Sequence, residues 1–188
     1  MSEHGLFVTF EGPEGSGKST QAALLRERLA MEGWEVVQAR EPGGTPTGEA
    51  IRGILQHDHS GEPIHPEAEV LLFAASRAQL VRQVILPALE RGAAVVCDRF
   101  ADSTTAYQGF GRAFGADKMI EINAFAIDGA EPDVTFLLDL EVEAGFDRLV
   151  ERHQATGSGP DRFEREERAF HDRVRRGYLD LARRFPER

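Results

Sequence analysis

FEGPEGSGKST, residues 10–20 of this chain, fits the pattern G-x-x-x-x-G-K-[ST], whose fixed positions hold Gly12, Gly17, Lys18 and Ser19. A short apolar run at residues 6–10 predicts a strand before this segment, and the Ala- and Leu-rich residues 20–31 predict a helix after it. A strand, a glycine-rich turn and a helix N-terminus form the setting in which backbone N–H groups converge on an anion. The segment therefore predicts a phosphate-binding loop.

The residues of this loop have distinct expected roles. Lys18 would reach the β- and γ-phosphates of a bound nucleotide, and the Ser19 hydroxyl would hold Mg²⁺. The chain has only two lysines, Lys18 and Lys118, so a lysine at this position favours phosphate binding. The alternative interpretation is a glycine-rich turn capped by Ser19. The predicted nucleotide-binding residues are Gly12, Pro13, Glu14, Gly15, Ser16, Gly17, Lys18 and Ser19.

Length and composition limit the class of protein. The 188 residues suit a single domain, and 32 acidic residues stand against 22 Lys and Arg, for a net charge of −10. We therefore expect no nucleic-acid partner, because proteins that bind nucleic acid usually carry a basic face. The single cysteine, Cys97, fits a reducing cytoplasm. Neither a signal peptide nor a run of eighteen apolar residues is apparent, so we expect a cytoplasmic protein without a membrane span.

Predicted strands and helices alternate along the chain. Strands are expected at residues 6–10, 34–39, 93–97 and 134–140, and helices at residues 20–31, 49–56, 66–91, 103–109, 117–128, 143–153 and 163–184. This order predicts an α/β fold of three layers, of the P-loop NTPase type, in which helices cover both faces of a parallel sheet. Ligands of such sheets bind beyond the carboxyl ends of the strands. A Gly-rich segment at residues 154–162 predicts a mobile lid, in a lid region of about residues 148–165.

Two pairs of residues carry candidate chemistry. Asp98 and Arg99 end the strand at residues 93–97, where an acid can position Mg²⁺ and an arginine can grip a phosphate. The alternative is a surface ion pair at a strand end. Phe73 and Arg77 are one helical turn apart, so an aromatic ring and a guanidinium would share a face and could recognise a base. The alternative is a core phenylalanine beside an arginine that extends to solvent.

Other polar groups surround these pairs. Residues 103–108, STTAYQ, offer hydroxyls and an amide suited to a base edge or a sugar, or else a capped surface helix. Arg148, Arg152 and Arg162 could fold over a triphosphate, or else form a solvated face. The histidines have no metal-ligand spacing, so no zinc site is expected, and His57-Asp58-His59 is interpreted as loop polarity.

These residues resemble those of one family, the thymidylate kinases, which are P-loop enzymes that phosphorylate dTMP. Residues 96–108, VCDRFADSTTAYQ, are similar to the signature of that family at every fixed position. REPGGT at residues 40–45 resembles its second hallmark loop, and LFAASR at residues 72–77 resembles its base-binding helix. The likeness extends from about Leu6 to Tyr178.

The resemblance implies a role for each residue of an acceptor site. Phe73 is expected to stack on thymine and Arg77 to read it, in a pocket lined by Ser103, Thr104 and Gln108. Tyr107 is expected to close on the deoxyribose, and Glu14 to face its 3′-hydroxyl. The monophosphate is expected to lie against Arg52 and Arg99, above a floor shaped by Glu41 and Pro42.

The implied reaction is in-line transfer of a phosphoryl group from ATP to dTMP, which forms dTDP. Mg²⁺ is expected at Ser19 and Asp98, and Lys18, Arg99 and a lid arginine are the expected catalytic residues. Gly15 stands where eukaryotic members have a basic residue, so the compensating arginine is expected from the lid, with Arg152 preferred to Arg148. Members of the family are usually homodimers, with the helices around residues 66–91 and 117–128 at the interface.

The chain departs from the pattern of the family in one respect. The family normally continues past Arg188 with a further strand and a final helix that help to bind adenine, so we expect an incomplete sheet here.

Three rival functions are considered beside this one. A P-loop GTPase would need an Asn-Lys-x-Asp segment, and neither lysine has that context. A nucleoside kinase would accept thymidine in place of dTMP. A binding protein without catalytic activity is the third rival.

Overall fold

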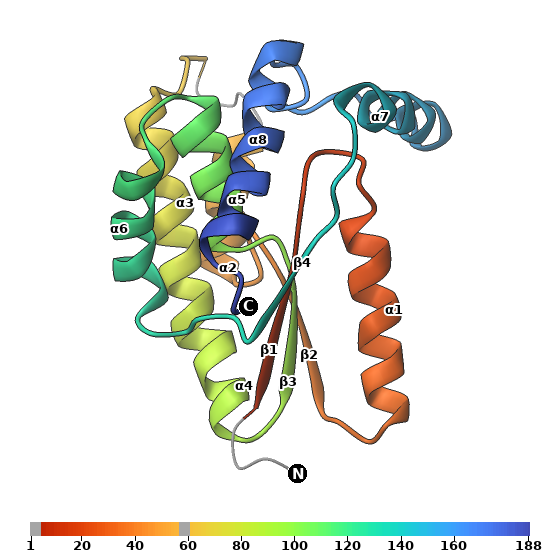
Figure 1. The fold of residues 1–188 in the computed structure, drawn as a ribbon, viewed down its shortest axis with the longest axis vertical. Coiled ribbons are helices and arrows are strands. Elements are labelled where there is room, and N and C mark those ends of the chain that lie inside the picture. The colour runs from red at the N-terminus through yellow and green to blue at the C-terminus, as the bar shows by residue number, and fades with distance from the viewer. Residues whose placement is uncertain (1–4, 57–60) are drawn as a thin grey trace.

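The centre of the protein is a parallel sheet of four strands, seen in the computed structural model, which describes residues 5–56 and 61–188 (Figure 1). The strands are β1 (Leu6–Glu11), β2 (Val36–Arg40), β3 (Ala94–Asp98) and β4 (Val134–Leu137), in the order β2-β3-β1-β4. Phe10 of β1 and Arg40 of β2 both lie opposite Asp98. The carboxyl ends of these strands therefore meet at one edge of the sheet.

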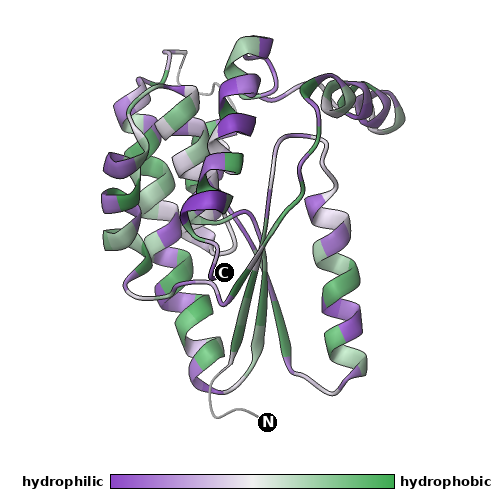
Figure 2. Cartoon of the chain, viewed as in Figure 1, coloured by the Kyte–Doolittle hydropathy of each residue, from purple (hydrophilic) through white to green (hydrophobic). Residues whose placement is uncertain are grey.

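The apolar side chains of β1 and β3 fill cores on both faces of the sheet. Phe7 and Val95 pack toward α3 (Pro66–Leu80), whereas Val8 and Val96 pack toward α1 (Lys18–Met31). Successive side chains of a strand point to opposite faces, so a continuous apolar run is what a doubly covered strand requires. Figure 2 shows this as largely green strands between helices with purple outer positions.

Helices on both faces confirm the predicted three-layer α/β fold. Helix α1 covers one face, and α3 covers the other together with a group of shorter elements (Figure 1). Further helices are α2 (Pro46–Gln56), α6 (Ala116–Ile127), α7 (Val142–Thr156) and α8 (Arg168–Arg184).

Two predicted helices are not regular α-helices. The helix expected at residues 66–91 is α3 followed by a π-helical turn, η1 (Val81–Ile85), and by α4 (Leu86–Glu90). Pro87 lacks an N–H and its ring would clash with the carbonyl four residues earlier, which a wider π-turn relieves. The helix expected at residues 103–109 is α5 (Ala101–Thr104) followed by the π-helix η2 (Thr105–Gly111).

Several predicted boundaries are also wrong. Helix α1 begins at Lys18 and not at residue 20, because Gly17, with φ of 92°, is its N-cap. Helix α2 begins at Pro46 and not at residue 49, since a proline in the first turn of a helix needs no acceptor for an N–H group. Strand β2 is offset toward the C-terminus of its predicted range, and β4 ends three residues before its predicted end. Helix α8 begins at Arg168 and not at residue 163, because Asp161 Oδ1 accepts the N–H groups of Phe163 and Glu164 and holds a turn there. His57 and His59 lie outside the described residues.

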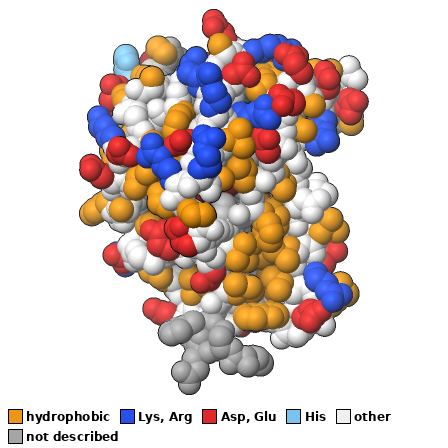
Figure 3. All heavy atoms as spheres, in the orientation of Figure 1, with side chains coloured by type: hydrophobic (Ala, Val, Ile, Leu, Met, Phe, Trp, Pro, Cys, Tyr) orange, Lys and Arg blue, Asp and Glu red, His pale blue; other side chains and the backbone are white. Residues whose placement is uncertain are grey.

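The surface has exposed apolar side chains at several places. Val134 and Phe136 of β4 are 37% and 45% exposed. Figure 3 shows apolar side chains gathered at the surface on this side of the molecule. The continuous helical stretch Pro66–Glu90 is long and apolar enough to cross a membrane by length and composition. It also contains Glu69 and Arg77, whose side chains are buried against polar groups of the same domain.

Candidate active site

A pocket of about 490 Å³ lies at the carboxyl edge of the sheet. The P-loop lines one side of it, and α7 and the segment after α7 line another. The rest is lined by α2, α3, α5 and η2 and by the residues that end β2 and β3 and follow them. Edges of this kind gather residues from loops that follow different strands. The predicted site residues in its wall are Glu14, Gly15, Gly17, Lys18, Ser19, Glu41, Pro42, Arg52, Phe73, Asp98, Arg99, Ser103, Thr104, Tyr107, Gln108, Arg148 and Arg152.

The P-loop is shaped by glycines that no other residue could replace without a clash. Gly12 has φ of 143°, and a Cβ there would lie 2.5 Å from the Leu138 carbonyl oxygen. Gly15 has φ of 71°, and a Cβ there would lie 2.5 Å from the Gly145 carbonyl oxygen of α7. The loop can therefore wrap tightly only because these positions lack side chains.

Lys18 lies inside the curve of this loop. Its Nζ donates to the carbonyl oxygens of Gly12 and Pro13, at 3.0 and 2.6 Å, and to Ser16 Oγ at 3.1 Å. Burial, followed by repulsion from Arg99, lowers the pKa of Lys18 to about 7, although Glu14 and Asp98 act in the opposite direction. A lysine with this pKa becomes more fully protonated, and so gains positive charge, when an anion binds beside it.

Ser19 and Asp98 form a pair of oxygen groups beside the lysine. Ser19 Oγ donates to Asp98 Oδ2 at 2.5 Å, although 79 residues separate them in sequence. The contact links the first residues of α1 to the end of β3. Hydroxyl and carboxylate oxygens are the donors that Mg²⁺ prefers, so this pair fits a magnesium ion bound next to phosphates. Among the described residues, no group of three or more His, Cys, Asp or Glu could hold a metal. A magnesium ion at Ser19 and Asp98 would therefore also need oxygens of a bound phosphate as ligands.

Arg99 occupies the middle of the site in a strained conformation. Its φ is 67°, a region that residues other than glycine rarely adopt, and its N–H donates to the Phe10 carbonyl at 3.0 Å. Its guanidinium donates to Glu14 Oε1 at 2.7 Å and to the Gly12 carbonyl at 3.1 Å. It also lies 5.2 Å from the ring centre of Tyr107. Backbone strain of this kind persists where the surrounding structure holds a functional side chain in place.

Glu14 is the charge partner of this arginine. Burial alone would raise the pKa of Glu14, but Arg99 and Lys18 lower it to about 2. Tyr107 Oη donates to the same carboxylate oxygen at 2.8 Å. Glu14 is therefore an acceptor-only group at ordinary pH, held by two donors from different elements.

Glu11, the last residue of β1, accepts hydrogen bonds from residues at the start of α5. Its carboxylate accepts from the Phe100 N–H at 2.8 Å and from Ser103 Oγ at 2.6 Å, and Tyr178 Oη also donates to it at 3.3 Å. Burial and the charge of Asp102 raise the pKa of Glu11 to about 7. These bonds fix the start of α5, from which Ser103 enters the pocket wall.

Arg77 is not in the pocket wall. Its side chain is 1% exposed and makes a bidentate ion pair with Glu41, at 3.1 and 2.5 Å. It also donates to Asn123 Oδ1 at 2.7 Å and to Thr104 Oγ1 at 2.9 Å. Burial raises the pKa of Glu41, and Arg77 opposes that rise. Arg77 therefore orders Thr104 and the Glu41–Pro42 turn in this structure, and its direct contact with a base stays a prediction.

An aromatic wall faces the P-loop across the pocket. Phe73 and Phe163 pack with ring centres 5.7 Å apart, and Tyr107 meets Phe163 edge-on at 5.9 Å. Gln108, which is 1% exposed, also lines this part of the pocket. Flat rings beside an amide suit a planar base.

The predicted lid arginines have different partners. Arg148 Nη1 donates to the Gly15 carbonyl of the P-loop at 3.2 Å. Arg152 pairs with Glu164 at 2.6 Å, and Arg162 pairs with Glu69 at 2.6 Å, away from the pocket wall. Arg52 Nη1 donates to the Pro42 carbonyl at 2.9 Å and lines the pocket from α2.

The sequence profile of the Thymidylate kinase family matches residues 10–188. The chain belongs to the thymidylate kinase family. It is 51% identical over 185 residues to "Thymidylate kinase" of Citrifermentans bemidjiense, which covers 98% of this chain and 82% of the relative. It is 50% identical over 184 residues to "Thymidylate kinase" of Deinococcus radiodurans, covering 98% and 86% of the two chains. The crystal structure of thymidylate kinase from Ehrlichia chaffeensis is similar with a TM-score of 0.79 at 34% identity, covering 98% of this chain and 90% of that one.

Membership of this family confirms the resemblance drawn from the three motifs. The function is that of the family, the phosphorylation of dTMP to dTDP. The chain is accordingly an enzyme, a transferase that binds nucleotides. The roles of individual side chains stay predictions.

Some pocket residues were missed by the sequence interpretation. Four of them lie in the lid region, where the periodicity of apolar residues indicated only a loop between two helices. Phe163 is the most informative, because the aromatic residue in the segment DRFE was assigned to a helix and not to the pocket. The missed residues are Thr20, Arg40, Gln56, Leu149, Asp161, Phe163 and Glu164.

Proposed function

We propose that this protein transfers the γ-phosphoryl group of ATP to dTMP, with Mg²⁺ at Ser19 and Asp98 and with the residues of one pocket in defined roles. The observation that carries the proposal is the position of Arg99. Its guanidinium contacts the P-loop carbonyl of Gly12 on one side and the Glu14 and Tyr107 side chains on the other. A donor phosphate at the loop and an acceptor phosphate at Arg99 would thus be adjacent, as in-line transfer requires.

The phosphate side of the pocket supports a nucleoside triphosphate. The P-loop from Gly12 to Ser19 would bind the β- and γ-phosphates through backbone N–H groups, and Lys18 would exchange its carbonyl partners for phosphate oxygens. Mg²⁺, when bound, would neutralise charge on the phosphates. Ser19 and Asp98 would hold it, since their oxygens already lie 2.5 Å apart.

The opposite side of the pocket supports dTMP. Phe73 would stack on thymine, with Thr104 and Gln108 at its edge and with Arg77 acting on the base from behind Thr104. Ser103 and Tyr107 would line the sugar, and Glu14 would accept a hydrogen bond from its 3′-hydroxyl. Arg52 and Arg99 would hold the 5′-phosphate over Glu41 and Pro42.

A lid arginine would stabilise the charge that moves during transfer. Both candidates line the pocket, but Arg148 already contacts the P-loop whereas Arg152 is paired with Glu164. These contacts favour Arg148, in contrast to the order suggested by the sequence. For Arg152 to act, its ion pair with Glu164 would have to open.

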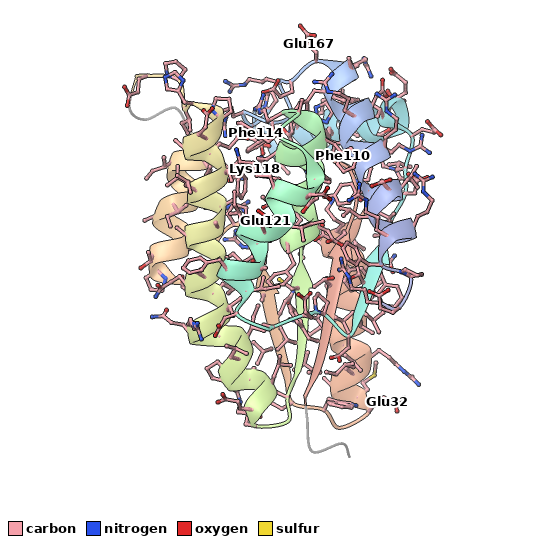
Figure 4. All side chains as sticks on the ribbon, turned by 60° about the vertical axis from the view of Figure 1, so that its left-hand side comes forward. Glu32, Phe110, Phe114, Lys118, Glu121 and Glu167 are labelled. Carbon is pink, nitrogen blue, oxygen red and sulfur yellow. The ribbon has the colours of Figure 1, made fainter. Side chains whose placement is uncertain are left out.

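We also propose that the protein is a cytoplasmic homodimer that pairs through α3 and α6. These helices lie side by side in Figure 4, where Lys118 and Glu121 mark α6. Leu71 of α3 is 64% exposed and Phe125 of α6 is 89% exposed. Large apolar side chains at this exposure favour an interface with a second copy.

The test of the proposed reaction is ADP formation by the purified chain with ATP and Mg²⁺. The acceptors would be dTMP, UMP, AMP, GMP and thymidine, offered one at a time, with Lys18→Ala as the matched variant. We expect a signal selective for dTMP that falls at least about 100-fold in Lys18→Ala. Turnover of thymidine in preference to dTMP would instead identify a nucleoside kinase, and unchanged turnover in Lys18→Ala would contradict the P-loop assignment.

A further inference from the structure

A buried carboxylate, Glu69, lies directly behind the aromatic wall of the pocket. It belongs to α3 and its side chain is 1% exposed. Its Oε1 accepts from Gln108 Nε2 at 2.7 Å. Arg112 donates to both of its oxygens at 3.3 Å, Arg162 pairs with Oε2 at 2.6 Å, and the two arginines so balance its charge. Glu69 is not part of the pocket wall, and the proposed reaction gives it no role.

The bond between Glu69 and Gln108 determines which way the Gln108 amide points. A carboxylate can only accept hydrogen bonds, so the amide nitrogen, and not the amide oxygen, must face Glu69. Gln108 Oε1 then lies on the other side of the amide. That oxygen is buried and has no hydrogen-bond partner within the described residues, and Gln108 lines the pocket.

An unpartnered buried acceptor in a pocket wall needs a donor from a ligand. The rings of Phe73, Phe163 and Tyr107 define the same wall, so the donor would belong to a planar base packed against them. Thymine and uracil have an N–H at position 3, whereas cytosine has only an acceptor nitrogen there. The orientation of the Gln108 amide thus separates these bases at position 3.

We propose that Glu69 is a positioning residue that holds Gln108 as a hydrogen-bond acceptor, and so makes the pocket select pyrimidines with an N–H at position 3. The inference rests on the proposed placement of dTMP in this pocket. Glu69 acts only through Gln108. Arg112 and Arg162 keep the carboxylate in place, since Arg162 also donates to the Leu55 carbonyl at 2.9 Å and Arg112 also pairs with Glu166 at 2.6 Å.

The test is a comparison of dUMP with dCMP as competitive inhibitors of dTMP phosphorylation. Both lack the thymine methyl group, so the pair differs only at positions 3 and 4 of the base. In Glu69→Gln the new amide can donate or accept, which lets Gln108 adopt either orientation. The ratio to compare is the inhibition constant of dCMP divided by that of dUMP. We expect this ratio to fall at least about tenfold in Glu69→Gln, because dUMP binds more weakly and dCMP more tightly.

The matched control is Arg112→Gln, which removes one ion pair from Glu69 and leaves the Gln108 bond intact. It should preserve the ratio of inhibition constants, even if both variants lose thermal stability. An equal change for dUMP and dCMP in Glu69→Gln would mean a purely structural role and would overturn the proposal. Absence of dTMP turnover in the wild-type protein would instead overturn the proposed function on which the inference rests.

A measurement on the wild-type protein covers the case in which Glu69→Gln does not fold. The Gln108 side-chain amide can be followed by NMR during a titration with dTMP. We expect the Nε2 proton that is donated to Glu69 to be protected from exchange with solvent before and after dTMP is added, because its hydrogen bond is kept. Free exchange of that proton in the absence of dTMP would overturn the proposal.

Discussion

Lys18 is the residue whose charge should depend most directly on the ligand. Its pKa is lowered to about 7, first by burial and then by Arg99, so above pH 7 much of the free protein has an uncharged lysine. Bound phosphate favours the charged form and raises the pKa. The gain in affinity from this charge is therefore complete below pH 7 and is lost as the pH rises above 7.

The prediction is net uptake of protons by the protein when ATP binds at pH 8. The terminal phosphate of ATP is already ionised at this pH, so it contributes no proton change of its own. Calorimetry in two buffers with different ionisation enthalpies measures the uptake. Lys18→Arg is the control, because an arginine stays charged and should remove the uptake while it keeps a cation in the loop. Equal uptake in both proteins would show that another group titrates.

Single residues also mark how far the sequence could predict the site. Lys18 and Ser19 lie in a contiguous motif whose geometry is local, and Arg99 follows a strand whose end is readable from its apolar run. The sequence could not place Arg77, because its burial depends on Glu41, a partner 36 residues away. Glu69 was missed for the same reason, since nothing in its own neighbourhood predicts a bond to Gln108.

At the scale of elements, strands were predicted better than helix ends. The run at residues 93–97 is buried on both faces, so its composition alone indicated a central strand. The ends of α1 and α8 are set by Gly17 and by the turn around Asp161, which depend on backbone angles and on side-chain acceptors. The π-helical turns η1 and η2 share the composition of α-helices, so periodicity could not separate them.

The packing of α7 against the P-loop should affect catalysis only by setting where α7 and its Arg148 lie. A Cβ at Gly145 would lie 2.6 Å from the Glu14 carbonyl oxygen, so Gly145→Ala must push α7 away from the loop. Arg148 would move with the helix. We predict a fall in kcat of about tenfold or more, because small displacements of charged groups are costly in phosphoryl transfer.

The KM for dTMP should change little in Gly145→Ala, because Phe73 and Gln108 belong to other elements. Steady-state kinetics separate the two parameters. Gly53→Ala in α2 is the control, since a Cβ there meets nothing within 4 Å and should leave kcat unchanged. A variant Gly145→Ala with normal kcat would indicate that α7 does not bring a catalytic arginine to the loop.

The described residues expose large apolar side chains at several places, and only one of these places is proposed as an interface. Leu71 and Phe125 lie on α3 and α6, whereas Met31, 75% exposed, lies at the end of α1 across the sheet (Figure 1). A net charge of −10 would repel two copies, so an apolar contact must outweigh that repulsion. The α3 and α6 side has two large apolar groups on adjacent helices, which is the better candidate.

We therefore predict a dimer in solution that Phe125→Glu combined with Leu71→Glu converts to a monomer. Two buried carboxylates at a pairing surface would be unpaired and close to their symmetry mates, which is strongly unfavourable. Sedimentation equilibrium gives the mass of each species. Met31→Glu adds one such carboxylate on the far side and should stay dimeric. A wild-type protein that sediments as a monomer would contradict the proposed dimer. Equal dissociation by Met31→Glu would mean that α3 and α6 do not form the pairing surface.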